Sequence, residues 1–389
     1  MLKTMNERTK TMQPSSLMEM VRLKKKLIGE GKDIIDFSVG DPDFPSPSHV
    51  IKRIQDESLN ERYHKYPVPT EGMLEFRQAM AYFYKIRFGV TLDVDREIQV
   101  AMGTKEIWSH LMWTLLEPGD VCIMQDPSYP TYRIQALACG AEIYYLPLRP
   151  ENSFVPELDG IPADICSRAR LLCLNYPNNP TGGVADLDFL QHVIDFCRKN
   201  EILLAYDNAY SETTYDGYVA PSILQVPGAT DIAIESWSLS KSFSMAGWRI
   251  GAMVGNADML KALRVMKSNI DFGPPSVIQL GAVSALTEDP LKYTAHYRNL
   301  YQKRRDLVID GLRSIGLTVP KCLGCAFLWV PVPNGYTDET WARHVLECAN
   351  VMFVPGSIYG KEGKGFVRIS LTVADERIQE AMNRIAVTL

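Results

Sequence analysis

One stretch of the sequence decides the fold, and it reads Ser236-Trp-Ser-Leu-Ser-Lys-Ser-Phe-Ser-Met-Ala-Gly-Trp-Arg-Ile-Gly251. It continues the apolar run Ile232–Ser236, which predicts a buried strand. Lys241 therefore lies just beyond the carboxyl end of that strand, flanked by small hydroxyl residues. In open α/β sheets, ligands bind at the carboxyl ends of strands. The stretch predicts such a sheet with Lys241 in its ligand site, and an ordinary Ser/Lys surface loop is the alternative.

Strand-like runs alternate with helix-like segments on either side of this stretch. The expected helices are Lys105–Leu116, Thr131–Ala138 and Leu187–Asn200. The expected strands are Gln99–Ala101, Val121–Gln125, Glu142–Leu146, Ala169–Asn175, Ile202–Asp207, Ile232–Ser236 and Ile250–Gly255. Apolar strands separated by helices predict an α/β fold whose mostly parallel sheet is covered on both faces.

The C-terminal third has a different pattern, which predicts a smaller α+β domain. Its expected helices are Pro290–Gly311, Glu339–Cys348 and Glu376–Val387, and the N-terminal helix Ser16–Gly29 is expected to pack with them. Its expected strands are Leu317–Val319, Ala326–Val330, Val351–Val354 and Phe366–Leu371. We therefore expect a large domain at 46–279 and a small domain built from 1–45 and 280–389.

Composition narrows the classes of protein. The chain has 389 residues, 46% of them apolar and 22% charged, which is typical of a globular protein with roughly two or three domains. Its formal charge is −5, so we expect neither nucleic acid nor an anionic membrane surface as a partner. There is no apolar run long enough to span a membrane and no pattern of a secretion signal. Scattered cysteines in apolar runs favour reduced thiols and a cytoplasmic location.

The pair Cys322-Leu-Gly-Cys325 is a lone CxxC, with no second pair or histidine cluster near it in the sequence. A redox or metal site is therefore less favoured than a turn that enters the strand Ala326–Val330. We expect no metal ion.

Asp207 closes the expected strand Ile202–Asp207, and Tyr210 follows three residues later. A carboxylate at a strand end can pair with the pyridinium nitrogen of a cofactor and keep that ring an electron sink. Tyr210 can donate a hydrogen bond to a phenolate oxygen. The alternative is that Asp207 only caps the following helix.

Three further strand ends carry groups suited to a flat, phosphorylated ligand. Met102-Gly-Thr-Lys105 opens a helix, whose first N–H groups form an anion site. Tyr129 can stack on a ring, although a lone aromatic is more often part of a core. Asn175-Tyr-Pro-Asn-Asn-Pro-Thr-Gly-Gly183 is rigid and presents an asparagine side chain. Ser238, Ser240 and Arg249 offer hydroxyl and guanidinium donors to a phosphate.

The order of these motifs resembles the fold-type I pyridoxal-phosphate-dependent aminotransferases of class I and II. The resemblance rests on Asn-Asn-Pro-Thr-Gly at 178–182, Asp-x-Ala-Tyr at 207–210, Ser-x-Ser-Lys at 238–241 and Gly-Trp-Arg-Ile-Gly at 247–251. It covers essentially the whole chain. It implies pyridoxal 5′-phosphate as the cofactor, L-amino acids and 2-oxo acids as substrates, and a homodimer with its sites at the interface.

The resemblance also implies a role for each matching residue. Lys241 forms the Schiff base with the cofactor and then carries the proton between Cα and C4′. Asp207 pairs with the pyridine nitrogen. The other implied cofactor contacts are Tyr210 and Asn179 at O3′, Tyr129 on the ring, Gly103, Thr104, Lys105, Ser238, Ser240 and Arg249 at the phosphate, and Tyr66 at the phosphate of the partner subunit.

On the substrate side, the resemblance assigns Arg368 to the α-carboxylate, with Asn179 and the backbone of Gly40 beside it. Taken alone, Gly40 is equally a turn residue, and Arg368 an exposed strand residue. Gly103-Thr-Lys-Glu106 and Met266-Lys-Ser-Asn-Ile-Asp271 are most similar to bacterial enzymes named LL-diaminopimelate or alanine–glutamate aminotransferases.

The choice of amino acid stays open in the sequence. Pro14-Ser-Ser-Leu-Met18 departs from the Pro-Pro-Tyr-Leu-Phe that is frequent in that branch. Lys105 either contacts a distal substrate carboxylate or is an exposed residue at a helix start. The same cofactor residues also serve β-eliminating lyases and oxygen-dependent amino-acid oxidases or hydroxylases, which are the alternative function.

Overall fold

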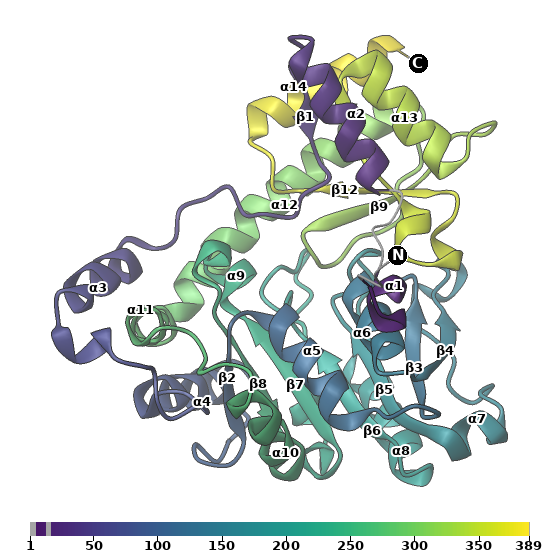
Figure 1. The fold of residues 1–389 in the computed structure, drawn as a ribbon. Helices are drawn as coiled ribbons and strands as arrows, with labels where there is room; N and C mark the ends of the chain where they lie inside the picture. Colours follow the sequence, from purple (N-terminus) through teal and green to yellow (C-terminus); the bar gives the residue numbers. More distant parts are fainter. Residues whose placement is uncertain (1–4, 13–16, 389) are drawn as a thin grey trace.

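A seven-stranded sheet forms the body of the molecule in the computed structural model, which describes residues 5–12 and 17–388 (Figure 1). The strand order is β2-β8-β7-β6-β5-β3-β4. These strands are β2 (Ile98–Ala101), β3 (Val121–Asp126), β4 (Glu142–Pro147), β5 (Ala169–Asn175), β6 (Leu203–Asp207), β7 (Ala233–Ser238) and β8 (Gly251–Gly255). Neighbouring strands from β4 to β7 pair parallel, whereas β8 is antiparallel to both β7 and β2. The prediction of a mostly parallel sheet is confirmed.

Helices cover both faces of this sheet. Successive residues of a strand point to opposite faces, and in the central strands the residues on both faces are apolar. In β5, Leu172 faces one core and Cys173 faces the other. The helices of this part are α3 (Ser48–Ser58), α4 (Leu74–Phe88), α5 (Thr104–Leu115), α6 (Pro130–Ala138), α7 (Ala163–Arg168), α8 (Leu187–Lys199), α9 (Leu239–Ser242), α10 (Ala257–Ser268) and α11 (Ser276–Thr287). The short α1 (Glu7–Thr11) lies beside α6.

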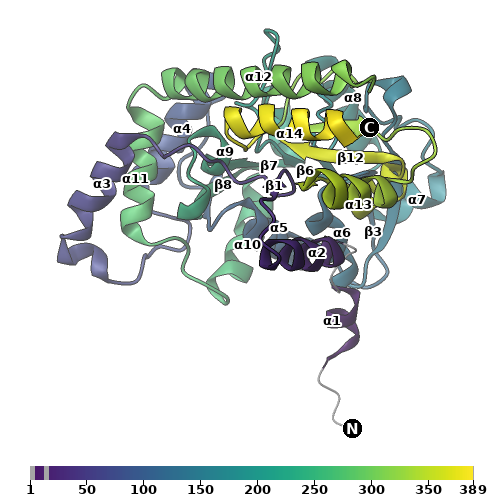
Figure 2. The same cartoon turned by 90° about the horizontal axis from the view of Figure 1, so that it is seen from above.

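The second part lies above the carboxyl ends of the large sheet (Figures 1 and 2). Its strands are β1 (Ile35–Asp36), β9 (Phe327–Pro331), β10 (Val351–Met352), β11 (Val354–Pro355) and β12 (Phe366–Ser370), and its helices are α2 (Leu17–Gly29), α12 (Pro290–Ser314), α13 (Asp338–Ala349) and α14 (Asp375–Thr388). Antiparallel β11, β12 and β9 form one small sheet, and β1 pairs parallel with β10. Met20 of α2 is buried in the same core as Val308, Trp341 and Ile385.

Two expected strands differ in the structure. Leu317–Val319 is not a strand: Gly316 takes a positive φ of 82° after α12, and the Leu317 N–H bonds back to Leu312 O of that helix. Val351–Val354 is not one strand either. It divides into β10 and β11, which belong to different sheets. The Ser16 end of the expected first helix, and the segment 14–16, lie outside the described residues.

Helix α11 packs against α3 and α4, and its Ala282, Ala285 and Leu286 enter the core of the large sheet. The domain boundary that we placed at 279/280 from the sequence therefore runs through a helix of the large part. Within residues 5–12 and 17–388, no helix combines the length and hydrophobicity needed to cross a membrane.

Candidate active site

A cavity of about 270 Å³ lies where the carboxyl ends of β5, β6 and β7 meet the second part of the molecule. The register places Asn175, Asp207 and Ser236 level on three adjacent strands, so their side chains meet at one edge of the sheet. The lining includes most of the site residues predicted from sequence, namely Gly40, Thr104, Lys105, Tyr129, Asn179, Asp207, Tyr210, Ser238, Ser240, Lys241, Arg249 and Arg368.

Asp207 is buried at the floor of the cavity and accepts three hydrogen bonds. The Tyr132 hydroxyl donates to its Oδ2, while Ser236 Oγ donates to Oδ1 at 2.8 Å and the Ala209 N–H donates at 3.2 Å. Burial raises the pKa of Asp207, and the hydrogen bonds from Tyr132 and Ser236 act in the opposite direction. The carboxylate is thus held rigidly, with its orientation set by two neighbouring elements.

Lys241 reaches into the cavity from α9, one turn beyond β7. Its Nζ donates a hydrogen bond to the backbone oxygen of Gly40, which comes from the N-terminal part of the chain. Burial lowers the pKa of Lys241 to about 8, and the positive charges of Arg368 and Arg249 add to this effect, while Asp41 opposes it. A neutral amine is therefore accessible near physiological pH, as nucleophilic and general-base chemistry requires.

One end of the cavity is built from backbone and hydroxyl donors. Gly103 has a φ of 78° and directly precedes α5, whose first N–H groups at Thr104 and Lys105 have no acceptor within the helix. The Arg249 guanidinium packs so closely on Gly103 that a Cβ there would overlap it. Ser238 and Ser240 come from the end of β7 and from α9. Together these donors form a cradle for an anion.

Arg368 forms the opposite wall. It lies on β12, donates to Asn179 Oδ1 at 3.0 Å and to Ser38 O at 2.8 Å, and stacks over the Phe327 ring at 3.8 Å. It is 7% exposed, and its Nε has no acceptor among the residues that the structure describes. A Cβ at Gly40 would overlap the Phe327 ring, so glycine is required for the close approach. A fixed, partly unsatisfied guanidinium is suited to a carboxylate ligand.

The three predicted tyrosines lie in different environments. Tyr129 is half-buried in the lining, with its ring 5.7 Å from that of Tyr132. Tyr210 is buried, and its ring meets Phe327 edge-on at 5.9 Å. Tyr66 is 76% exposed and does not line this cavity, and its ring instead contacts Phe272 at 5.0 Å.

Sequence analysis missed several residues that shape the site. Tyr132 contacts Asp207, and Trp108 Nε1 donates to Ser236 Oγ at 2.9 Å, which gives a hydrogen-bonded series from Trp108 through Ser236 to Asp207. A signal existed for Tyr132, since it lies one helical turn after Tyr129 and shares its face. No local pattern pointed to Trp108, because its partner is 128 residues away.

These groups fit pyridoxal phosphate. The glycine cradle and its donors match a phosphate, the buried Asp207 carboxylate matches a ring nitrogen, and the Lys241 amine matches an aldehyde. Arg368 carries an unpaired Nε for a carboxylate of the substrate. The donor set thus accounts for both the cofactor and an amino-acid substrate.

Comparison with known proteins agrees with this chemistry. The family model of aminotransferases of class I and II matches residues 32–385. The LL-diaminopimelate aminotransferase of Moorella thermoacetica is 46% identical over 94% of this chain and 94% of its own length. LL-diaminopimelate aminotransferase 2 of Nostoc sp. is 41% identical over 97% of each chain.

Solved structures share the whole architecture. The substrate-bound structure of BacF from Bacillus subtilis has a TM-score of 0.95 and 32% identity, covering 99% of this chain and 98% of that chain. A double mutant of the Thermus thermophilus aspartate aminotransferase has a TM-score of 0.92 and 26% identity over the full length of both.

The family resemblance is therefore confirmed, and the chain belongs to the class I and II aminotransferases. It is a pyridoxal-phosphate-dependent transaminase, an enzyme that transfers an amino group to a 2-oxo acid. The lyase and oxidase alternatives are not favoured by these relatives.

Proposed function

We propose that this enzyme takes its amino group from an L-amino acid with a second, distal carboxylate, with LL-diaminopimelate as the first candidate. The names of the relatives that match almost the whole chain support this choice. The cavity agrees with a donor that carries charge at both ends. Arg368 faces one end, while Lys105 lies exposed at the cavity margin, where its ammonium can meet a distal carboxylate.

The bound cofactor supplies an aldehyde that condenses with amines and a ring that withdraws electrons from the substrate Cα. Asp207 holds the proton on the ring nitrogen, and Tyr210 and Asn179 donate to the ring oxygen. Lys241 Nζ would hold the aldehyde carbon of the cofactor in the resting enzyme, and its amine would be the group that takes up and gives back the proton of the substrate Cα. Tyr129 keeps the ring in place by stacking.

On the substrate side, Arg368 orients the α-carboxylate with its guanidinium, and Gly40 allows the backbone to lie against the substrate. Gly103, Thr104, Lys105, Ser238, Ser240 and Arg249 hold the phosphate. Since these donors lie on β7, α5 and α9 or, for Arg249, just before β8, they keep the reacting atoms in register with Lys241.

We further propose a homodimer in which Tyr66 contacts the cofactor phosphate of the partner subunit. The support is its position: Tyr66 is exposed and outside its own cavity, beside Phe272, which is 44% exposed. Exposed aromatic rings that pack on each other suit an interface. Sedimentation should give a dimer, and a monomer with full activity at working concentration would contradict this arrangement.

A cytoplasmic location belongs to the same proposal. All eight cysteines are free thiols, and six of them are buried, which suits a reducing compartment.

The function is tested with a panel of L-amino acids that includes LL-diaminopimelate. Purified holoenzyme is incubated with each donor and 2-oxoglutarate or pyruvate, with and without oxygen. We expect a new amino acid to appear in equal amount with the 2-oxo acid of the donor, and LL-diaminopimelate to give the highest kcat/KM. Ammonia and peroxide formed without an acceptor would refute transamination. Equal rates with L-alanine would refute only the substrate assignment.

A further inference from the structure

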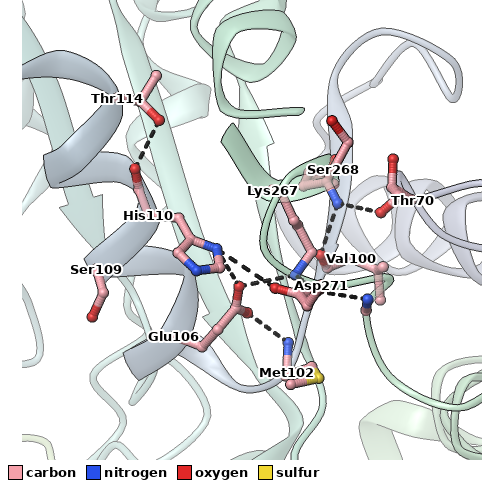
Figure 3. Close-up of polar contacts among 12 residues, drawn as sticks. Thr70, Val100, Met102, Glu106, Ser109, His110, Thr114, Lys267, Ser268 and Asp271 are labelled. Atoms are coloured by element: carbon pink, nitrogen blue, oxygen red, sulfur yellow. Dashed lines mark hydrogen bonds and ion pairs between the residues drawn. The ribbon is translucent and has the colours of Figure 1, made fainter. Parts of the chain in front are cut away.

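A charged cluster lies at the contact between α5 and α10 and includes Glu106, His110, Lys267 and Asp271 (Figure 3). Lys267 is completely buried, and its Nζ lies 2.9 Å from Glu106 Oε1 and 2.6 Å from Asp271 Oδ1. His110 Nδ1 lies 2.6 Å from the same Glu106 oxygen and 3.8 Å from Asp271 Oδ2. None of these side chains lines the active-site cavity.

The cluster has the composition of a metal site, but its cation is a lysine. Glu106, His110 and Asp271 present oxygen and nitrogen atoms within 4.8 Å of one another. The Lys267 ammonium contacts both carboxylates and supplies the positive charge that a metal ion would otherwise bring. Burial acts to raise the pKa of Glu106, but its contacts with His110 and Lys267 lower it overall, so the carboxylate stays ionised.

Glu106 connects this cluster to the cradle. Its Oε2 accepts a hydrogen bond from the Met102 N–H at 2.9 Å, while Oε1 faces Lys267, so one carboxylate spans the distance between them (Figure 3). Met102 immediately precedes Gly103, the residue with positive φ at the start of α5. The N–H group directly before Gly103 is thus held by the same carboxylate that Lys267 contacts.

Asp271 is the second carboxylate that contacts the Lys267 ammonium, opposite Glu106. Its Oδ1 accepts the Gly273 N–H at 2.6 Å in addition to Lys267, which fixes the segment after α10. Two stretches of sequence, 103–106 and 266–271, thus meet although Glu106 and Lys267 are 161 residues apart. Both stretches were singled out by resemblance, yet the catalytic roles account for neither Glu106 nor Lys267.

We propose that Glu106 and Lys267, with Asp271, form a positioning unit that fixes the turn at Met102–Thr104 for the cofactor phosphate. Lys267 is a positioning residue, because it acts through Glu106 and touches neither cofactor nor substrate. A buried ammonium between two carboxylates holds this geometry more rigidly than an exposed pair, since neither solvent nor salt competes for it. The inference rests on the proposed role of the cradle as the phosphate site.

The test measures how tightly the phosphate is held, independently of turnover. Holoenzyme is incubated with excess amino donor, so that Lys241 no longer holds the cofactor covalently, and is dialysed against increasing inorganic phosphate. The cofactor retained is measured by its absorbance. The variants are Glu106→Gln, which keeps an acceptor for Met102, and Lys267→Met. The matched control is Lys261→Met, the same substitution at an exposed position of the same helix.

We expect Glu106→Gln and Lys267→Met to release half of the cofactor at about tenfold lower phosphate than the wild type, and Lys261→Met to behave like the wild type. Asp271→Asn, which leaves Glu106 in place, should have a smaller effect. If Lys267→Met does not fold, Glu106→Gln alone carries the test, since it preserves side-chain volume.

The thermal midpoint of unfolding is recorded for each variant. Lowered midpoints with unchanged phosphate release would show a merely structural role and overturn the inference. A wild type that retains no pyridoxal phosphate would instead refute the proposed role of the cradle. Retention by the wild type and by Glu106→Gln alike would refute the positioning unit alone.

Discussion

The two walls of the active site are built in different ways. The cofactor wall comes from neighbouring strands of one sheet, where Asp207 of β6 accepts from Ser236 of β7. The substrate wall comes from distant parts of the chain: Arg368 of β12 donates to Asn179, 189 residues away, and to Ser38, 330 residues away. Apart from the proposed contact of Tyr66 of the partner subunit, the first wall is complete within one folded unit, and the second exists only after the two parts of the molecule have come together.

Under the proposed roles of these residues, this difference separates cofactor binding from substrate binding. Side chains on adjacent parallel strands keep their spacing through the backbone ladder, so the cofactor wall is rigid. The Arg368 guanidinium depends on contacts between the two parts, so its position responds to their relative placement. Changes on the first wall should alter cofactor chemistry, and changes on the second should alter substrate affinity. The following predictions test that separation.

The largest effect is expected at Lys241, which extends from α9 on the cofactor wall to the backbone oxygen of Gly40 on the substrate wall. Lys241→Ala removes the amine that captures the cofactor and moves the proton, so kcat should fall by about 10³-fold or more. Single-turnover kinetics and the absorbance of the bound cofactor measure this loss. Lys261→Ala, the same substitution at an exposed position of α10, serves as the control. Near-normal turnover by Lys241→Ala would refute its catalytic role.

The pH dependence of cofactor capture comes next in size. Because burial lowers the pKa of Lys241 to about 8, the amine is protonated and unreactive below that pH and neutral above it. The rate of capture of pyridoxal phosphate by cofactor-free enzyme should therefore rise with pH, by about 50-fold from pH 6 to pH 8, and level off above about pH 9. Stopped-flow absorbance gives this profile. A rate that keeps rising to pH 10 would show an ordinary lysine pKa.

A change confined to the substrate wall should leave the cofactor in place. Arg368→Lys keeps the charge but loses the planar fork, so KM for the amino donor should rise about 30-fold with a smaller change in kcat. Cofactor retention should match that of the wild type. Steady-state kinetics and dialysis measure the two quantities. Loss of cofactor in this variant would contradict the division between the two walls.

The smallest effect is expected from Tyr132→Phe, which removes one of the hydrogen bonds to Asp207 and nothing from the substrate wall. The kcat should fall about fivefold, equivalent to roughly 1 kcal/mol, while KM stays unchanged. Asp207→Ala on the same wall provides the upper limit for comparison. A rise in KM without loss of kcat would mean that Tyr132 acts on the substrate instead.

Much of the fold was predictable because its signals are local. The strand Ala169–Asn175 agrees with β5 residue for residue, since a short apolar run between helical patterns has few other structures available. The expected strand Leu317–Val319 failed because the αL turn at Gly316 ties that segment to the end of α12. A short apolar run next to a helix end does not by itself predict a strand.

By itself, the sequence determined that Lys241, Asp207 and Gly103 lie next to the ends of expected strands. Each of these residues had an ordinary structural alternative when taken alone, and it was their shared position at strand ends, together with the order of the motifs, that indicated one site and the family. Only the tertiary structure decided the partners of these groups. Tyr132 on Asp207, Asn179 on Arg368 and Lys267 on Glu106 are contacts between segments far apart in sequence. The physical reason is that the pKa and geometry of a group depend on the orientation and burial of its side chain. Both follow from packing between elements that are distant in the sequence, and no local sequence pattern encodes that packing.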